Sequence, residues 1–133
     1  MQRLEKIKPT TEDKTNSLAY LIHNYYSCVE DILKEIEKVF EEGGRFSKDN
    51  YHKTLLLHAT YEIQQVRPII ISASNYIFLL EILKFRHVFR HAYNYVLDPV
   101  RVKNNKSLII KNHAILIDDF NNFIAFLKSI YDN

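Results

Sequence analysis

The segment 75-NYIFLLEILKFRHVFRHAYNYVL-97 contains no glycine or proline, and its apolar side chains recur every three or four residues. This spacing predicts an α-helix over residues 75–97. On a wheel of about 100° per residue, one face carries Phe78, Phe85, Phe89, Ala92 and Val96. Leu79, Leu80 and Leu83 fall on the opposite arc, so the first half of this helix is apolar on both sides. We therefore expect neighbouring helices, or a second copy of the chain, to cover it.

Three further segments show the same helical spacing: residues 10–40, residues 51–66, and residues from 99 to near the C-terminus. Gly43-Gly44, Pro68 and Asp98-Pro99 separate the four segments, and each is a residue pattern that ends or begins a helix. Four helices with short connections predict an all-α, up-and-down four-helix bundle. We expect residues 1–133 to form a single domain, with residues 1–9 as a short tail.

Three details of the packing also follow from the pattern. Thr10, followed by Asp13, is expected to cap the first helix, and 69-IIIS-72 is expected to be a buried connector that leads to a cap at Ser72 or Ser74. The face of the last helix expected to meet the core consists of Ile110, Ala114, Ile117, Phe120, Ile124 and Leu127.

Composition favours a globular protein: 47% of the residues are hydrophobic and 26% are charged. The net charge of +2 is too small to indicate a strong nucleic-acid or membrane binder, so attraction to phosphate has to come from local clusters. The charged N-terminus lacks a signal-peptide pattern, and the apolar run 76-YIFLLEILKF-85 is too short to span a bilayer. We expect a soluble, cytoplasmic protein with no membrane partner.

Several polar residues are expected to have structural roles. No glutamate is followed three residues later by histidine, the pattern typical of metal-binding bundles, so His58, Glu62 and His113 with Asp118-Asp119 are not expected to bind metal. His23 is expected to be hydrogen-bonded near the core, and Cys28 to be a small buried residue. We therefore expect no metal and no cofactor.

The segment 86-RHVFRHAYNY-95 gathers two arginines, two histidines and two tyrosines. A solvated basic face is the simplest interpretation, but lysine and glutamate serve solubility better, as in 34-KEIEKVFEE-42. Histidine exchanges protons near neutral pH, and arginine binds phosphate oxygens through paired hydrogen bonds. The cluster is therefore a candidate site for RNA cleavage without a metal ion.

Within this cluster we assign the catalytic roles to Arg86 and His91, and supporting roles to Tyr93, His87 and Arg90. Arg86 and His91 lie roughly 140° apart on an ideal helix. Because they diverge, we expect the substrate to lie in a groove beside a partner subunit, where both side chains can reach it.

The string 85-FRHVFRHAY-93 resembles the signature of the HEPN superfamily, an arginine and a histidine separated by a short spacer, here four residues. It is more closely similar to the HepT toxins, in which a polar residue follows the arginine and a tyrosine follows the histidine two positions later. The string 45-RFSKDNYH-52 also has this arginine–histidine pattern, but it straddles a predicted loop and lacks the tyrosine. Around the signature, the segments LIHNYYSCVEDIL, EEGGRF, YHKTLLLHA and RPIIIS come in the order typical of HepT-like proteins.

This resemblance implies a homodimer whose two signatures face a shared cleft, and a metal-independent endoribonuclease. Arg86 would hold the phosphate, and His91 would act as general base or general acid. Tyr93 matches the tyrosine that, in HepT toxins, a minimal nucleotidyltransferase antitoxin modifies with AMP to silence the toxin. The implied partners are RNA, a second copy and that antitoxin.

A second function remains open on the sequence alone. Some small helical bundles pair with nucleotidyltransferases as non-catalytic, substrate-binding or scaffold subunits. The intact Arg86, His91 and Tyr93 favour the ribonuclease, since a scaffold has no need of them.

Overall fold

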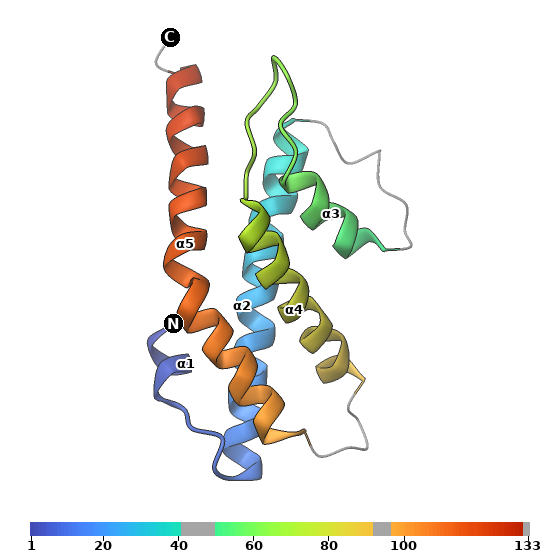
Figure 1. The fold of residues 1–133 in the computed structure, drawn as a ribbon, viewed down its shortest axis with the longest axis vertical. Helices are drawn as coiled ribbons and strands as arrows, with labels where there is room; N and C mark the ends of the chain where they lie inside the picture. Colours follow the sequence, from blue (N-terminus) through green and yellow to red (C-terminus); the bar gives the residue numbers. More distant parts are fainter. Residues whose placement is uncertain (41–49, 92–96, 132–133) are drawn as a thin grey trace.

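The computed structural model describes residues 1–40, 50–91 and 97–131, and the chain is an all-α bundle (Figure 1). Its helices are α1 (Gln2–Lys6), α2 (Glu12–Val39), α3 (Tyr51–Ala59), α4 (Ala73–Arg90) and α5 (Pro99–Tyr131). Within the described ranges there is no strand, only an isolated bridge between Ile63 and Arg67. The predicted fold class is thus confirmed, with one more short helix than expected.

The long helices α2 and α5 run in one direction, and α4 returns in the other (Figure 1). The shorter α3 packs against α2 and α4, while α1 packs against α2 and α5. None of the described helices has a stretch long and apolar enough to cross a bilayer.

Helices α2 and α4 supply the centre of the core. The fully buried side chains there include Ile22, Tyr26 and Leu33 on α2 and Leu79, Ile82 and Phe85 on α4. Each apolar side chain of this size contributes about 1.5–3 kcal/mol when it leaves water. Leu83 is also buried, at 8% exposure, and Leu80 is half-buried, so helices of the same chain cover Leu79 and Leu83 and part of Leu80. The neighbouring-helix alternative is therefore confirmed for this part of α4.

The N-terminal residues and the first cap differ from the prediction. The predicted short tail, residues 1–9, contains α1, which buries Leu4, and the Lys106 ammonium group donates hydrogen bonds to the carbonyls of Glu5 and Ile7. The cap of α2 is Thr11, whose hydroxyl accepts a hydrogen bond from the Lys14 amide at 3.2 Å. Adjacent threonines both fit a capping pattern, so the sequence alone did not distinguish them.

Two helices are shorter than predicted. Helix α3 ends at Ala59 rather than Val66. The segment that follows is a loop, and the buried side chain of Arg67 binds its backbone. Its buried guanidinium group donates hydrogen bonds to the carbonyls of Tyr61, His58 and Pro68. Helix α4 ends at Arg90, with His91 as its C-cap. The rest of the helix predicted over 75–97 falls on residues 92–96, outside the described residues, and on Leu97.

The core face of α5 is rotated by one residue from the predicted one. The buried positions are Val102, Asn105, Ile109, Leu116, Phe120 and Phe123. Of the predicted set, Phe120 is correct, whereas Ile110, Ile117 and Ile124 are 45%, 40% and 45% exposed. Two neighbouring apolar rows, each with seven-residue spacing, run along this helix, and periodicity does not tell which one faces inward.

Asp119 fixes this rotation, because its carboxylate reaches the start of α4. The Oδ2 atom accepts hydrogen bonds from the Ser72 amide at 2.7 Å, from the Ser72 hydroxyl at 2.9 Å, and from the Asn75 side-chain amide. Ser72 is the N-cap of α4, as predicted, but its hydroxyl bonds to Asp119 instead of to the helix. A negative charge at a helix N-terminus is also favourable to the helix dipole.

We predict that Asp119→Ala lowers the free energy of unfolding by about 1.5–3 kcal/mol, the usual range for hydrogen bonds to a charged group. Urea denaturation followed by circular dichroism measures this change. The adjacent Asp118 is exposed, and Asp118→Ala is the matched control, with an expected change within about 0.5 kcal/mol. If both variants lowered the free energy of unfolding equally, the observed rotation of α5 would be contradicted.

Candidate functional site

A cavity of about 620 Å³ lies between α3 and the second half of α4, with one residue from the start of α5. Its described lining residues are Asn50, His52, Lys53, Leu83, Lys84, Arg86, His87, Val88, Arg90, His91 and Arg101. Lysine, arginine and histidine dominate this lining, and none of these residues is acidic. A cavity with such a lining attracts anions, and phosphate in particular.

The predicted site residues gather here. Arg86, His87, Arg90 and His91 all line the cavity, whereas Tyr93 lies outside the described residues. Arg86 and His91 diverge on an ideal wheel, yet both border the same space, because the cavity extends around the last turns of α4. Helix α3 of the same chain provides the facing wall of this cavity.

Arg86 is held by an aromatic ring of the core. Its guanidinium carbon lies 5.8 Å from the ring centroid of Tyr26, which is fully buried on α2. This is a cation–π contact, and it fixes the guanidinium plane without using its N–H groups. The Arg86 Nε atom is buried without a hydrogen-bond partner, and no described carboxylate pairs with the residue. Arg86 is thus positioned yet still able to bind an oxyanion.

His87 and His91 lie side by side at the end of α4, with ring centroids 4.5 Å apart. His91 is the C-cap residue, and its backbone N–H bonds to the Val88 carbonyl at 3.3 Å. Both side chains are exposed. The helix end therefore presents two imidazoles to the cavity from the same wall.

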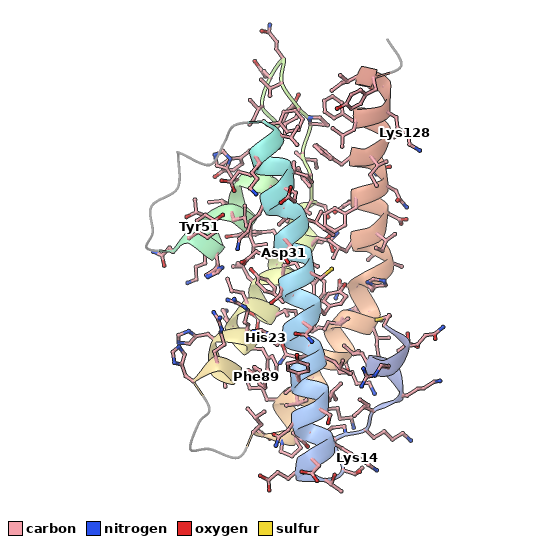
Figure 2. The ribbon with its side chains drawn as sticks, turned by 180° about the vertical axis from the view of Figure 1, so that it is seen from behind. Lys14, His23, Asp31, Tyr51, Phe89 and Lys128 are labelled. Carbon is pink, nitrogen blue, oxygen red and sulfur yellow. The ribbon has the colours of Figure 1, made fainter. Side chains whose placement is uncertain are left out.

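His23, on α2, packs behind this cluster. Its ring lies 5.4 Å from that of Phe89, and the two side chains meet between α2 and α4 (Figure 2). The Nδ1 atom is buried and has no hydrogen-bond partner among the described residues, whereas the Asn24 side chain forms a hydrogen bond with the residue, as the predicted hydrogen-bonded role requires. Burial lowers the pKa of His23 below its ordinary value of 6.5; the Asn24 side chain opposes the shift, while Arg86 and Arg90 add to it.

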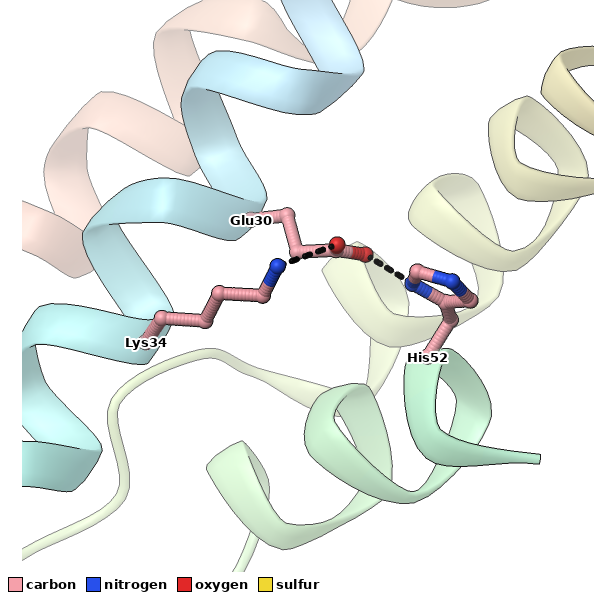
Figure 3. Close-up of polar contacts among 3 residues, drawn as sticks. All are labelled: Glu30, Lys34 and His52. Carbon is pink, nitrogen blue, oxygen red and sulfur yellow. Dashed lines mark hydrogen bonds and ion pairs between the residues drawn. The ribbon is translucent and has the colours of Figure 1, made fainter. Parts of the chain in front are cut away.

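Sequence reasoning missed a second group of residues on the α3 side. The Nδ1 atom of His52 lies 2.8 Å from Oε2 of Glu30, and the ammonium group of Lys34 lies 3.2 Å from Oε1 (Figure 3). Burial opposes ionisation of Glu30, but the bonds from His52 and Lys34 outweigh it and lower the pKa of the carboxyl group. Glu30 is therefore ionised at neutral pH, beneath the basic cavity.

One signal in the sequence pointed to this group. Glu30 follows Tyr26 by four residues on the inner face of α2, and a charged residue in an apolar row requires a buried partner. His52 also closes the second arginine–histidine pattern, 45-RFSKDNYH-52, whose Arg45 is outside the described residues. The sequence did not indicate that three other basic residues line the cavity, because exposed basic residues are common on any helix. These are Lys53, Lys84 and Arg101.

The polar residues that the sequence singled out away from the cavity have structural roles or are simply exposed. The His113 Nδ1 atom lies 2.8 Å from the Tyr25 hydroxyl, and Asp119 caps α4. Cys28 is exposed, so the prediction of a buried thiol is wrong. Across residues 1–40, 50–91 and 97–131, no group of three potential metal ligands is close enough together to hold an ion.

We predict that the stability of the protein falls as the pH drops below about 6.5, in part because of His23. Below that pH, His23 is protonated more readily in the unfolded chain than in the folded chain, where its pKa is lowered. Protonation therefore favours the unfolded state. His23→Phe keeps a ring against Phe89 and removes the titration. Between about pH 7.5 and pH 5.5 its melting temperature should fall less than that of the wild type, as measured by calorimetry. If the melting temperatures of the two proteins fell equally over this pH range, this role of His23 would be refuted.

Comparison with known proteins supports the assignment of the chain to a family. No curated protein and no solved structure matches it. A family model described as HepT-like protein matches residues 17–127, a span that begins in α2 and ends in α5. This is a HEPN-type family, and membership suggests a toxin of a toxin–antitoxin system. The chain therefore belongs to the HepT-like protein family.

Proposed function

We propose that this chain is a metal-independent endoribonuclease toxin, and that the basic cavity between α3 and α4 is its active site. The observation that carries the proposal is that Arg86 and His91 border one cavity without an acidic residue in its described lining. Membership in a HEPN-type family, whose members are generally ribonuclease-like, supports the same activity.

The cavity residues suit attack of a ribose 2′-hydroxyl on the neighbouring phosphate. Arg86, fixed on the Tyr26 ring, binds the phosphate oxygens and stabilises the negative charge that develops on them. His91 exchanges a proton with the reacting oxygens as general base or general acid. His87 and Arg90 add positive charge that attracts the RNA backbone.

We further propose that two copies associate and that a nucleotidyltransferase antitoxin neutralises them. The exposed row Ile110, Ile117 and Ile124 on α5 supports a contact surface, because aliphatic side chains aligned on one helix face favour association. The antitoxin would transfer AMP to Tyr93, two positions after His91. The added bulk and negative charge would then compete with RNA for the basic cavity.

We predict that the purified protein cleaves RNA in the presence of a chelator, and that Arg86→Ala and His91→Ala each lower the rate by about 100-fold or more. Lys111→Ala removes an exposed charge on α5 outside the cavity lining, and it should keep the wild-type rate. Rates are measured with a labelled oligoribonucleotide. If the wild type leaves RNA intact and its expression is harmless, the non-catalytic scaffold function is favoured instead.

We predict that Tyr93→Phe keeps ribonuclease activity but is not neutralised by the cognate nucleotidyltransferase. The phenyl ring preserves the shape of the side chain and lacks the hydroxyl that would accept AMP. Intact-mass spectrometry after co-expression should show one added AMP on the wild type and none on the variant. Neutralisation of both proteins to the same degree would exclude Tyr93 as the modification site.

A further inference from the structure

The α3 wall of the cavity contains a histidine that is fixed by a buried carboxylate. The Glu30 side chain is only 4% exposed, and its Oε2 atom holds His52 Nδ1 at 2.8 Å (Figure 3). The other carboxylate oxygen is occupied by Lys34 at 3.2 Å. A carboxylate this deeply buried is costly unless it is paired. Glu30 is paired on both oxygens, and it therefore fixes the imidazole orientation firmly.

The same contact determines which nitrogen of His52 is available for chemistry. An ionised carboxylate only accepts hydrogen bonds, so the Nδ1 atom is the donor. The Nε2 atom lies on the opposite side of the ring, away from Glu30 (Figure 3). The side chain is 39% exposed and lines the cavity, so a bound ligand can reach it. A histidine held in this way has its Nε2 atom free of Glu30 and able to exchange a proton with a bound ligand.

Cleavage of RNA by its own 2′-hydroxyl requires two proton transfers. One proton leaves the 2′-hydroxyl, and another must reach the 5′-oxygen as its bond to phosphorus breaks. A single histidine cannot do both in the same step. The attacking and leaving oxygens also lie on opposite sides of the phosphorus atom, so the two groups have to approach from opposite directions.

Two other histidines besides His91 line the cavity, and their positions decide between them. His87 is adjacent to His91, on the same wall and 4.5 Å away between ring centroids. His52 comes from α3 and thus from the facing wall. Of the histidines of this chain that line the described part of the cavity, His52 is thus the one that can approach a phosphate from a different helix than His91.

We propose that, within the ribonuclease activity proposed above, His52 is the general acid and Glu30 is its positioning residue. His91 removes the proton of the 2′-hydroxyl as the 2′-oxygen forms a bond to phosphorus. The bond from phosphorus to the 5′-oxygen breaks, and His52 donates its Nε2 proton to that oxygen. The products are a 2′,3′-cyclic phosphate and a 5′-hydroxyl, so atoms and charge balance without a cofactor.

The competing explanation is that the Glu30–His52 pair only joins α3 to α2. The variant His52→Asn separates the two roles, because the asparagine amide can still donate to Glu30 while the Nε2 acid is lost. Two RNA substrates are compared, one natural and one with sulfur in place of the bridging 5′-oxygen at the cleaved bond. A thiolate leaves without protonation because thiols are far more acidic than alcohols.

We expect His52→Asn to cleave the natural substrate about 100-fold more slowly than the wild type, and to cleave the sulfur substrate at close to the wild-type rate. Glu30→Gln should lower the cleavage rate of the natural substrate by a smaller factor, and it should also cleave the sulfur substrate at close to the wild-type rate. His91→Ala should be slow with both substrates, because it lacks the base and not the acid. His58→Asn, on the same helix but outside the cavity lining, is the matched control and should resemble the wild type with both.

Each other outcome overturns a defined part of the proposal. Equal losses on both substrates would make His52 structural, and wild-type cleavage of the natural substrate by His52→Asn would remove it from the reaction. If the wild type cleaves neither substrate, the ribonuclease function itself fails. The wild-type rate on the natural substrate therefore separates failure of the function from failure of the general acid.

Discussion

The contact between the inner face of α2 and the basic ends of α3 and α4 is the interaction on which the site depends. Many positive charges around one cavity repel each other, and the described lining contains no carboxylate to offset them. Residues of helix α2, which packs against α3 and α4, offset this repulsion. Tyr26 offers an aromatic face to Arg86, and Glu30 offers a buried carboxylate to His52. Both contacts hold a basic residue in place while leaving its outer side open to an anion.

The same helix links the site to the stability of the protein. Ile22, Tyr26 and Leu33 are core residues, and His23 and Glu30 lie beside them on the same helix. Because protein interiors are closely packed, the positions of these polar groups are set by the core and not by the cavity. The site is therefore rigid on its inner side, a property that catalysis by pre-positioned charges requires.

The sequence predicted the features that depend on local patterns. Helical periodicity identified the four main helices, and the Asp98-Pro99 pair correctly placed the start of α5, where the Asp98 carboxylate accepts a hydrogen bond from the Val100 amide at 2.9 Å. The clustering of Arg86, His87, Arg90 and His91 was also visible from their spacing. Features that depend on contacts between distant segments were missed. The inward row of α5 is selected by the hydrogen bond that the Ser72 amide donates to Asp119, and the contact of Glu30 with His52 joins residues on separate helices.

The proposed reaction proceeds through the ribose 2′-hydroxyl and the residues of this cavity. The most direct measurement is analysis of the product ends, in chelator, for an RNA and for the same RNA with a single 2′-deoxy substitution at the cleaved nucleotide. We predict a 2′,3′-cyclic phosphate and a 5′-hydroxyl from the first RNA, and no cleavage at the substituted position of the second. Cleavage next to the 2′-deoxy nucleotide, or products with a 5′-phosphate, would rule out this reaction.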